Sequence, residues 1–193
     1  IHADCPHYWK FGKEGETEEE FSKRMANNLE ELIIREGADT IAGFVAEPVQ
    51  GAGGVIPPSK NYFDLIQPIL KKYKIPLVAD EVICGFGRTG NLWGCETYNI
   101  KPDIIISSKC LTAGYFPMGA VIVNKEFADE FTSVSEEAEE FPHGFTAGGH
   151  PVGCAIALKA IDVIINEGLL ENVRAVSPYF HERLNEFNDY EHI

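Results

Sequence analysis

Four charged residues stand at or within three residues of the ends of short apolar runs of this sequence: Glu47, Asp80, Glu81 and Lys109. A lysine at the end of a buried strand is partly stripped of water, and such lysines are candidate nucleophiles toward carbonyl carbons. Carboxylates beside it would orient or neutralise the groups that react there. A structural ion pair of Lys109 with Asp80 or Glu47 is an equally good interpretation of the spacing.

The segment 85–90 matches the pattern G-x-G-x-x-G. In a dinucleotide-binding site these glycines form the first turn after a strand and open a helix. Here Asp80 and Glu81 stand between the predicted strand and the glycines, where they would repel a pyrophosphate. A tight loop braced by an arginine is the favoured interpretation, and a nicotinamide oxidoreductase is a remote alternative.

A second glycine-rich segment lies between His143 and His150. The hydroxyl of Thr146 and several backbone N–H groups before a helix could bind a phosphate. An ordinary turn that leads into a helix is the favoured interpretation of this pattern.

The elements that must position these residues alternate between strands and helices. Apolar runs without polar alternation, separated by helices, predict an α/β fold with a mainly parallel sheet flanked by helices. Such sheets bind ligands beyond the carboxyl ends of their strands, so the four charged residues are expected at one edge. The expected strands are 41–46, 77–79, 104–106 and 120–123.

The expected helices follow from caps and apolar spacing. Thr17 begins a capping box, and Gly37 ends that helix. Ser59 is expected to cap a second helix, which contains Pro68 and should kink there. The segment 151–166 is apolar on nearly every face and is expected to form a buried helix. Two further pieces are expected near 91–98 and from about 170 to 187.

Composition narrows the class of protein. The chain has 193 residues with 16 basic and 30 acidic side chains, a net charge of −14. A balance this negative argues against a nucleic-acid or anionic membrane partner. The acidic stretches 13–36 and 126–140 are expected to be solvated faces or loops. A metal site at the cluster His2, Asp4, Cys5 and His7 is not expected, because no second cluster stands at ligand spacing.

Five cysteines without a C-x-x-C pair, and the lack of a signal-peptide or membrane-span pattern, favour reduced thiols and a cytoplasmic location. The chain begins with Ile1 in what reads as the middle of a longer sequence.

Four motifs occur in order along the chain: 46–51, 79–90, 108–109 and 143–146. In this combination the sequence resembles a class III aminotransferase, a pyridoxal-phosphate enzyme of fold type I. The resemblance covers essentially the whole chain. The residues between 83 and 103 are most similar to those of the ω-amino acid:pyruvate branch. One departure is Ile83, since other branches carry a glutamine there that binds the cofactor's phenolic oxygen, although the pyruvate branch also commonly has isoleucine.

The resemblance implies a role for five residues. Lys109 would form the Schiff base with pyridoxal 5'-phosphate and move the proton during transfer. Asp80 would pair with the pyridinium nitrogen, Val82 would pack on the ring, and Glu47 would sit near the cofactor. Thr146 would bind the cofactor phosphate of the partner subunit in a homodimer or larger assembly.

The resemblance also implies a transaminase that moves an amino group from an ω-amine or ω-amino acid to a 2-oxo acid such as pyruvate. Another class III chemistry (decarboxylase, racemase or phospho-lyase) and a catalytically inert fragment remain alternatives. Residues 1–168 would be part of the large, cofactor-binding domain, and 169–193 would begin the C-terminal small domain. The phosphate loop, the ring-stacking aromatic residue and the substrate arginine would lie outside this chain.

Overall fold

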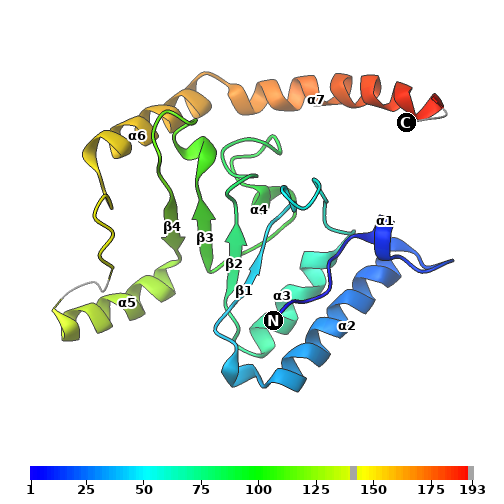
Figure 1. Ribbon diagram of the computed structural model, residues 1–193, viewed down its shortest axis with the longest axis horizontal. Coiled ribbons are helices and arrows are strands. Elements are labelled where there is room, and N and C mark those ends of the chain that lie inside the picture. Colours follow the sequence, from blue (N-terminus) through cyan, green and yellow to red (C-terminus); the bar gives the residue numbers. More distant parts are fainter. Residues whose placement is uncertain (140–142, 191–193) are drawn as a thin grey trace.

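The computed structural model describes residues 1–139 and 143–190. Its centre is a four-stranded sheet in the order β1-β2-β3-β4 (Figure 1). The first three strands run parallel, whereas β4 pairs antiparallel with β3 at one edge. The expected α/β fold with a mainly parallel sheet is confirmed. The strands are β1 (Phe44–Ala46), β2 (Leu77–Asp80), β3 (Ile104–Ser107) and β4 (Ala120–Val123).

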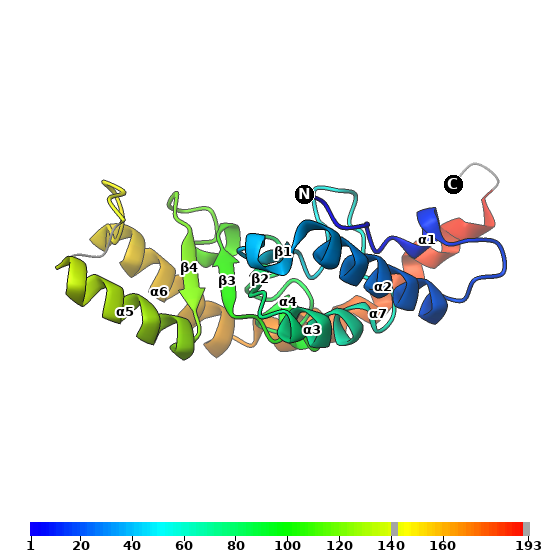
Figure 2. The ribbon, with the colours of Figure 1, turned by 90° about the horizontal axis from the view of Figure 1, so that it is seen from below.

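Helices connect and flank these strands. In the orthogonal view the molecule is elongated, with α5 and α6 toward one end and α1 and α2 toward the other (Figure 2). The helices are α1 (Tyr8–Phe11), α2 (Glu18–Glu36), α3 (Tyr62–Lys72), α4 (Gly94–Thr97), α5 (Lys125–Ala138), α6 (Pro151–Asn166) and α7 (Leu169–Asn185). Short 3₁₀ segments are η1 (Ala38–Thr40), η2 (Lys109–Leu111) and η3 (Glu186–Asp189).

The helix α2 begins and ends where the sequence predicts. The backbone N–H of Glu20 donates to the Thr17 hydroxyl, and the Glu20 carboxylate accepts from the Thr17 N–H at 2.8 Å, which completes the capping box. Gly37 ends the helix with a φ of 86°. The apolar side of α2 packs on α3 and β2 to form the main core, which includes Phe21, Met25, Leu29, Ile66, Leu70, Leu77 and Ala79.

The helix α3 begins later than expected, and Ser59 does not cap it. Asn61 precedes the first turn, with a φ of 62°. The hydroxyls of Ser59 and Ser22 lie 2.7 Å apart in the core, so Ser59 ties the start of α3 to α2 instead. Two buried hydroxyls satisfy each other there, which removes the cost of burying either one alone. Pro68 lies inside α3, which continues to Lys72.

Side-chain alternation gives the sheet two unlike faces. The α2–α3 pair covers the face that carries Ala79. The register pairs Asp80 with Ile106 and Ile106 with Val121, so these residues share the opposite face. On that face Val45 and Val121, on the two edge strands, are 61% and 67% exposed. Asp80 therefore lies on the more open face of the sheet.

The acidic stretch after residue 125 forms the helix α5 as far as it is described. Asn124 caps this helix by accepting a hydrogen bond from the Phe127 N–H at 3.0 Å. The helix explains the charge run as a solvated face, because the side chains of its acidic residues are exposed where described.

The helix α6 occupies the expected residues, but the expectation that it is buried was wrong. Only Gly153, Ala157 and Ile164 of its described residues are buried, and Leu158 is 71% exposed. One stripe of α6 packs beside η2 and Ala120, and the rest of its apolar surface faces outward. None of the described helices is long and apolar enough to cross a membrane.

Candidate active site

Three of the four charged residues singled out from the sequence stand at one edge of the sheet. Asp80 is the last residue of β2 and pairs in register with Ile106 of β3. Lys109 follows β3 by two residues, and Glu47 follows β1 by one. Since β1, β2 and β3 are parallel, these three side chains start from the same carboxyl edge, as expected.

Lys109 begins the short segment η2 in a backbone conformation that is rare for a side-chain-bearing residue. Its φ is 44°, in the left-handed region. Two bonds hold the turn: the Ser108 hydroxyl donates to the Met118 carbonyl at 3.0 Å, and the Leu111 N–H donates to the Ser108 carbonyl at 2.9 Å. Backbone strain of this kind is typical of functional positions.

The ammonium of Lys109 makes no ion pair with any residue in 1–139 or 143–190. The side chain is exposed, so the expectation that this lysine is partly stripped of water is wrong for the described residues. The alternative interpretation, a structural pair with Asp80 or Glu47, is therefore not what the structure contains. An amine in this position is available to a ligand.

Asp80 is half-buried and folds back on its own turn. One carboxylate oxygen, Oδ1, accepts from the Val82 N–H at 3.0 Å. This bond fixes the direction of the carboxylate and brings the half-buried Val82 into the same turn. Asp80 and Val82 thus form one local unit at the carboxyl end of β2.

Glu81 does not join Asp80 as an acid pair. It lies on the other side of the chain and is only 1% exposed. Its two carboxylate oxygens accept from the backbone N–H groups of Gly94 at 2.9 Å and Cys95 at 2.6 Å. Burial, with the nearby Glu81 carboxylate, raises the pKa of the Cys95 thiol. Strand alternation after Asp80 is the sequence signal that could have separated the two acids.

The tight contact around Gly94 predicts a large effect of a single methyl group. A Cβ at this position would lie 2.7 Å from Cys84 Cβ and 2.9 Å from Pro48 Cβ, where nothing can rotate away. We expect Gly94→Ala to lower the free energy of unfolding by about 1–3 kcal/mol, as overpacking of a core does. Chemical denaturation measures this. The control is Gly144→Ala, whose Cβ would have no described atom within 4 Å; an equal loss in both variants would contradict the contact.

Glu47 shapes the loop that follows β1. Its Oε2 accepts from the Gly51 N–H at 2.9 Å. A Cβ on Gly51 would lie 2.2 Å from Ile83 Cδ1, so the Ile83 side chain lies directly against this glycine. Ile83 therefore connects the loops after β1 and β2 through an apolar contact.

The glycine motif 85–90 forms a tight loop that opens no helix, since α4 begins only at Gly94. The expected arginine brace is present, but it comes from elsewhere in the chain. Arg174 of α7 donates to the Gly90 carbonyl, whereas Arg88 inside the motif is exposed. The loop is thus clamped against α7 and is not placed as a dinucleotide cradle.

Thr146 is not brought together with Asp80 and Lys109. It is exposed, on the segment 143–150, which leads from the end of α5 to the start of α6 beyond the β4 edge (Figure 1). His150 Nδ1 accepts from the Val152 N–H at 3.2 Å and so caps α6. Within the described residues this segment is a helix-entry turn.

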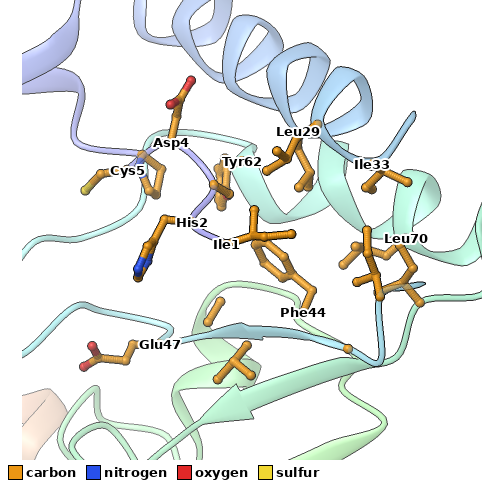
Figure 3. Close-up of a pocket in the computed structure, with 18 of the residues that line it drawn as sticks. Ile1, His2, Asp4, Cys5, Leu29, Ile33, Phe44, Glu47, Tyr62 and Leu70 are labelled. Atoms are coloured by element: carbon orange, nitrogen blue, oxygen red, sulfur yellow. The ribbon is translucent and has the colours of Figure 1, made fainter. Parts of the chain in front are cut away.

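A cavity of about 720 Å³ lies between the N-terminal residues, α2, α3 and β1 (Figure 3). Its wall is largely apolar. The Glu47 carboxylate points away from the apolar side chains of the wall, such as Leu29 and Phe44. Asp80 also lines this cavity, but Lys109 does not. The cavity therefore reaches the carboxyl ends of β1 and β2 but not Lys109, which follows β3. No group of His, Cys, Asp and Glu among the described residues could hold a metal ion.

The sequence matches the family model described as aminotransferase class-III over residues 6–193. The chain belongs to this family. An ω-aminotransferase from Paracoccus denitrificans has a structure with a TM-score of 0.96 and 66% identity, over 98% of this chain and 42% of that one. A PMP-bound aminotransferase from Vibrio fluvialis gives a TM-score of 0.97 and 66% identity, over 100% and 43%.

Curated relatives extend the comparison to plants. Gamma aminobutyrate transaminase 3, chloroplastic, from Solanum lycopersicum is 56% identical over 98% of this class III chain and 36% of its own length. The chain thus spans less than half the length of these relatives.

The expected cytoplasmic location was wrong. Relatives 51–56% identical to this chain, from Solanum lycopersicum and Oryza sativa, are named chloroplastic or mitochondrial. Reduced thiols and the lack of a membrane-spanning pattern are compatible with several compartments and do not distinguish among them.

The residues present fit pyridoxal phosphate in their chemistry. The site offers an amine without an ion-pair partner among the described residues, a carboxylate with one directed hydrogen bond, and the apolar side chain of Val82. These would serve, in that order, the aldehyde, the ring nitrogen and the ring face of the cofactor. Glu47 lies on the neighbouring loop.

Proposed function

We propose that the full-length protein containing this chain is a transaminase that uses pyridoxal phosphate on Lys109. The observation that carries the proposal is the amine of Lys109, free of ion pairs among the described residues, just beyond β3, the strand that pairs with β2 and Asp80. Structures similar to this chain include a PMP-bound aminotransferase and a PLP-bound aminotransferase mutant, both from Vibrio fluvialis. Family membership and geometry therefore support the same cofactor.

Each residue of the site has a task in this reaction. Bound pyridoxal phosphate supplies an electron sink through which an amino group leaves one carbon skeleton and enters another. Lys109 would hold the cofactor covalently and would move the proton at the carbon that carries the amino group. Asp80 presents a negative charge to the ring nitrogen, and Val82 packs on the ring. Glu47 lies near the cofactor, on the loop after β1.

The substrates we propose are an ω-amine or ω-amino acid as donor and a 2-oxo acid such as pyruvate as acceptor. The names of the relatives, ω-aminotransferase and gamma aminobutyrate transaminase, support a donor whose amino group lies away from a carboxylate. Ile83 supports the pyruvate branch, and its contact with Gly51 shows how an apolar side chain is accommodated there.

The test is a donor screen on the full-length protein with pyruvate as acceptor and alanine formation as readout. We expect turnover with 4-aminobutyrate or a simple primary amine, and slower turnover with 2-oxoglutarate in place of pyruvate. Carbon dioxide release or racemisation of an α-amino acid without alanine formation would contradict transamination.

We further propose that the full-length protein is a homodimer in which Thr146 binds the phosphate of the partner's cofactor. Thr146 is exposed, and the segment 143–150 that carries it lies beyond the β4 edge of the sheet (Figure 1). Nearby apolar side chains also face outward, among them Phe145, Val121 and Val152. A subunit interface would cover such a surface. The α7 helix, which begins after Gly168, would lead into the small domain.

Mixed dimers test this arrangement. Thr146→Ala and Lys109→Ala variants are expected to be nearly inactive alone at limiting cofactor. A hybrid dimer of the two contains one site with both Lys109 and Thr146 if the threonine serves the partner, so refolding the mixture should restore about a quarter of the wild-type activity. No gain on mixing would show that Thr146 acts within its own subunit or has no role.

A further inference from the structure

Glu81 is a buried charge to which the proposed function gives no task. The side chain is 1% exposed, and no basic residue of 1–139 or 143–190 forms an ion pair with it. Two backbone N–H groups at the start of α4 hold the carboxylate, at 2.6 and 2.9 Å. Burying a carboxylate is costly unless it is hydrogen-bonded in this way. These two bonds fix the Glu81 side chain against the backbone at the start of α4.

The backbone of Glu81 is fixed as well as its side chain. Its N–H donates to the Ile106 carbonyl at 2.9 Å, which extends the β2–β3 ladder one residue past Asp80. Its carbonyl accepts from the Gly85 N–H at 2.8 Å, which closes the turn that contains Val82. Asp80 and Val82 therefore flank a residue whose main-chain and side-chain polar groups are all bound.

The same contact reaches the loop that follows β1. Gly94, which donates to Glu81, lies against Pro48 and Cys84 so closely that no Cβ would fit. Pro48 is almost fully buried and directly follows Glu47. Glu81 thus joins β2, the start of α4 and the loop of Glu47.

We propose that Glu81 is a positioning residue for the cofactor site. It holds Asp80 and Val82 at the end of β2 and, through Gly94 and Pro48, holds the Glu47 loop against them. The carboxylate touches neither the cofactor nor the substrate and acts through Asp80. This role rests on the proposed function for its purpose, but its structural part can be measured without cofactor.

The first arm of the test is amide hydrogen exchange on the cofactor-free full-length protein. The variant Glu81→Gln turns one acceptor into an N–H donor that faces an N–H group. The matched control is Glu96→Gln, since Glu96 accepts from the Trp93 N–H at the same end of α4 but is exposed. We expect at least tenfold faster exchange in 80–85 and 47–51 for the Glu81 variant only. Faster exchange confined to 93–98 would overturn the proposal.

The second arm is a double-mutant cycle on cofactor affinity. Glu81→Gln should weaken binding of pyridoxal phosphate about tenfold in the wild-type background. If Glu81 acts through Asp80, the same change should weaken binding less than threefold in the Asp80→Asn background. Equal, additive losses in both backgrounds would overturn the proposal, because they would mean that Glu81 supports only the general fold.

Failure of the variant to fold and failure of the proposed function can both be told from failure of this proposal. If Glu81→Gln yields no folded protein, Glu81→Asp, which keeps the charge and loses one methylene, is taken through both arms with the same criteria. If the wild-type protein does not bind pyridoxal phosphate, the proposed function fails, and the exchange arm alone still decides whether Glu81 positions Asp80 and the Glu47 loop.

Discussion

The variant Lys109→Ala of the full-length protein is expected to lose covalent attachment of pyridoxal phosphate and at least about a thousandfold in transaminase kcat/KM. Lys109 supplies both the amine that bonds to the cofactor and the group that moves the proton, so one truncation removes two functions. The absorbance band of the bound cofactor and steady-state rates with pyruvate measure the two losses separately.

The control is Lys101→Ala, which truncates an exposed lysine just before β3, at the other end of the strand. This variant should keep the wild-type absorbance and rates within about twofold. Added methylamine or ethylamine should restore part of the lost rate to Lys109→Ala, because a free amine can replace the missing proton carrier. A Lys109→Ala protein that still binds the cofactor covalently would mean that another lysine is the nucleophile.

The second large effect is expected for Asp80→Asn. The amide keeps an oxygen that can accept from the Val82 N–H, as Asp80 Oδ1 does at 3.0 Å, so the turn is preserved while the charge is lost. Removing one preoriented charge from an active site costs about 10²–10³ in kcat. We expect a loss of this size, together with weaker cofactor binding and a changed absorbance of the bound cofactor.

Asp103→Asn is the matched control for the loss of a carboxylate on the same sheet. Asp103 Oδ2 accepts from the Leu77 N–H at 2.8 Å and Oδ1 accepts from Asn124 Nδ2 at 3.0 Å, at the amino end of β2, so an amide here can keep only one of the two bonds. This variant should lower the thermal midpoint more than Asp80→Asn does, yet keep cofactor affinity within about twofold. If Asp80→Asn instead keeps wild-type kcat and cofactor affinity, the assignment of Asp80 is wrong.

Local patterns were sufficient where one segment decides its own structure. The apolar run 77–79 followed by Asp80 gave β2 almost to the residue, and the capping box at Thr17 gave the start of α2. The meeting of Glu47, Asp80 and Lys109 at one edge followed from parallel strands alone. Their roles toward the cofactor stay predictions, which rest on the resemblance and on this geometry.

Long-range contacts decided what the sequence could not. Ser59 does not cap α3 as expected, because its hydroxyl is hydrogen-bonded to the buried hydroxyl of Ser22 on α2. The Glu81 side chain lies apart from that of Asp80, because the backbone N–H groups of Gly94 and Cys95 bind its carboxylate. The brace of the glycine loop came from Arg174, distant in sequence. The apolar helix α6 stayed largely exposed, since the described residues cover only one stripe of it.

The most direct test of the cofactor assignment is borohydride reduction of the full-length protein loaded with pyridoxal phosphate, followed by peptide mapping. Reduction makes the bond between lysine and cofactor permanent, so mass spectrometry reads the attachment site directly. The account predicts one phosphopyridoxyl group per subunit, on the peptide that contains Lys109. Label on a peptide without Lys109, or no label on a protein that turns over ω-amines, would contradict it.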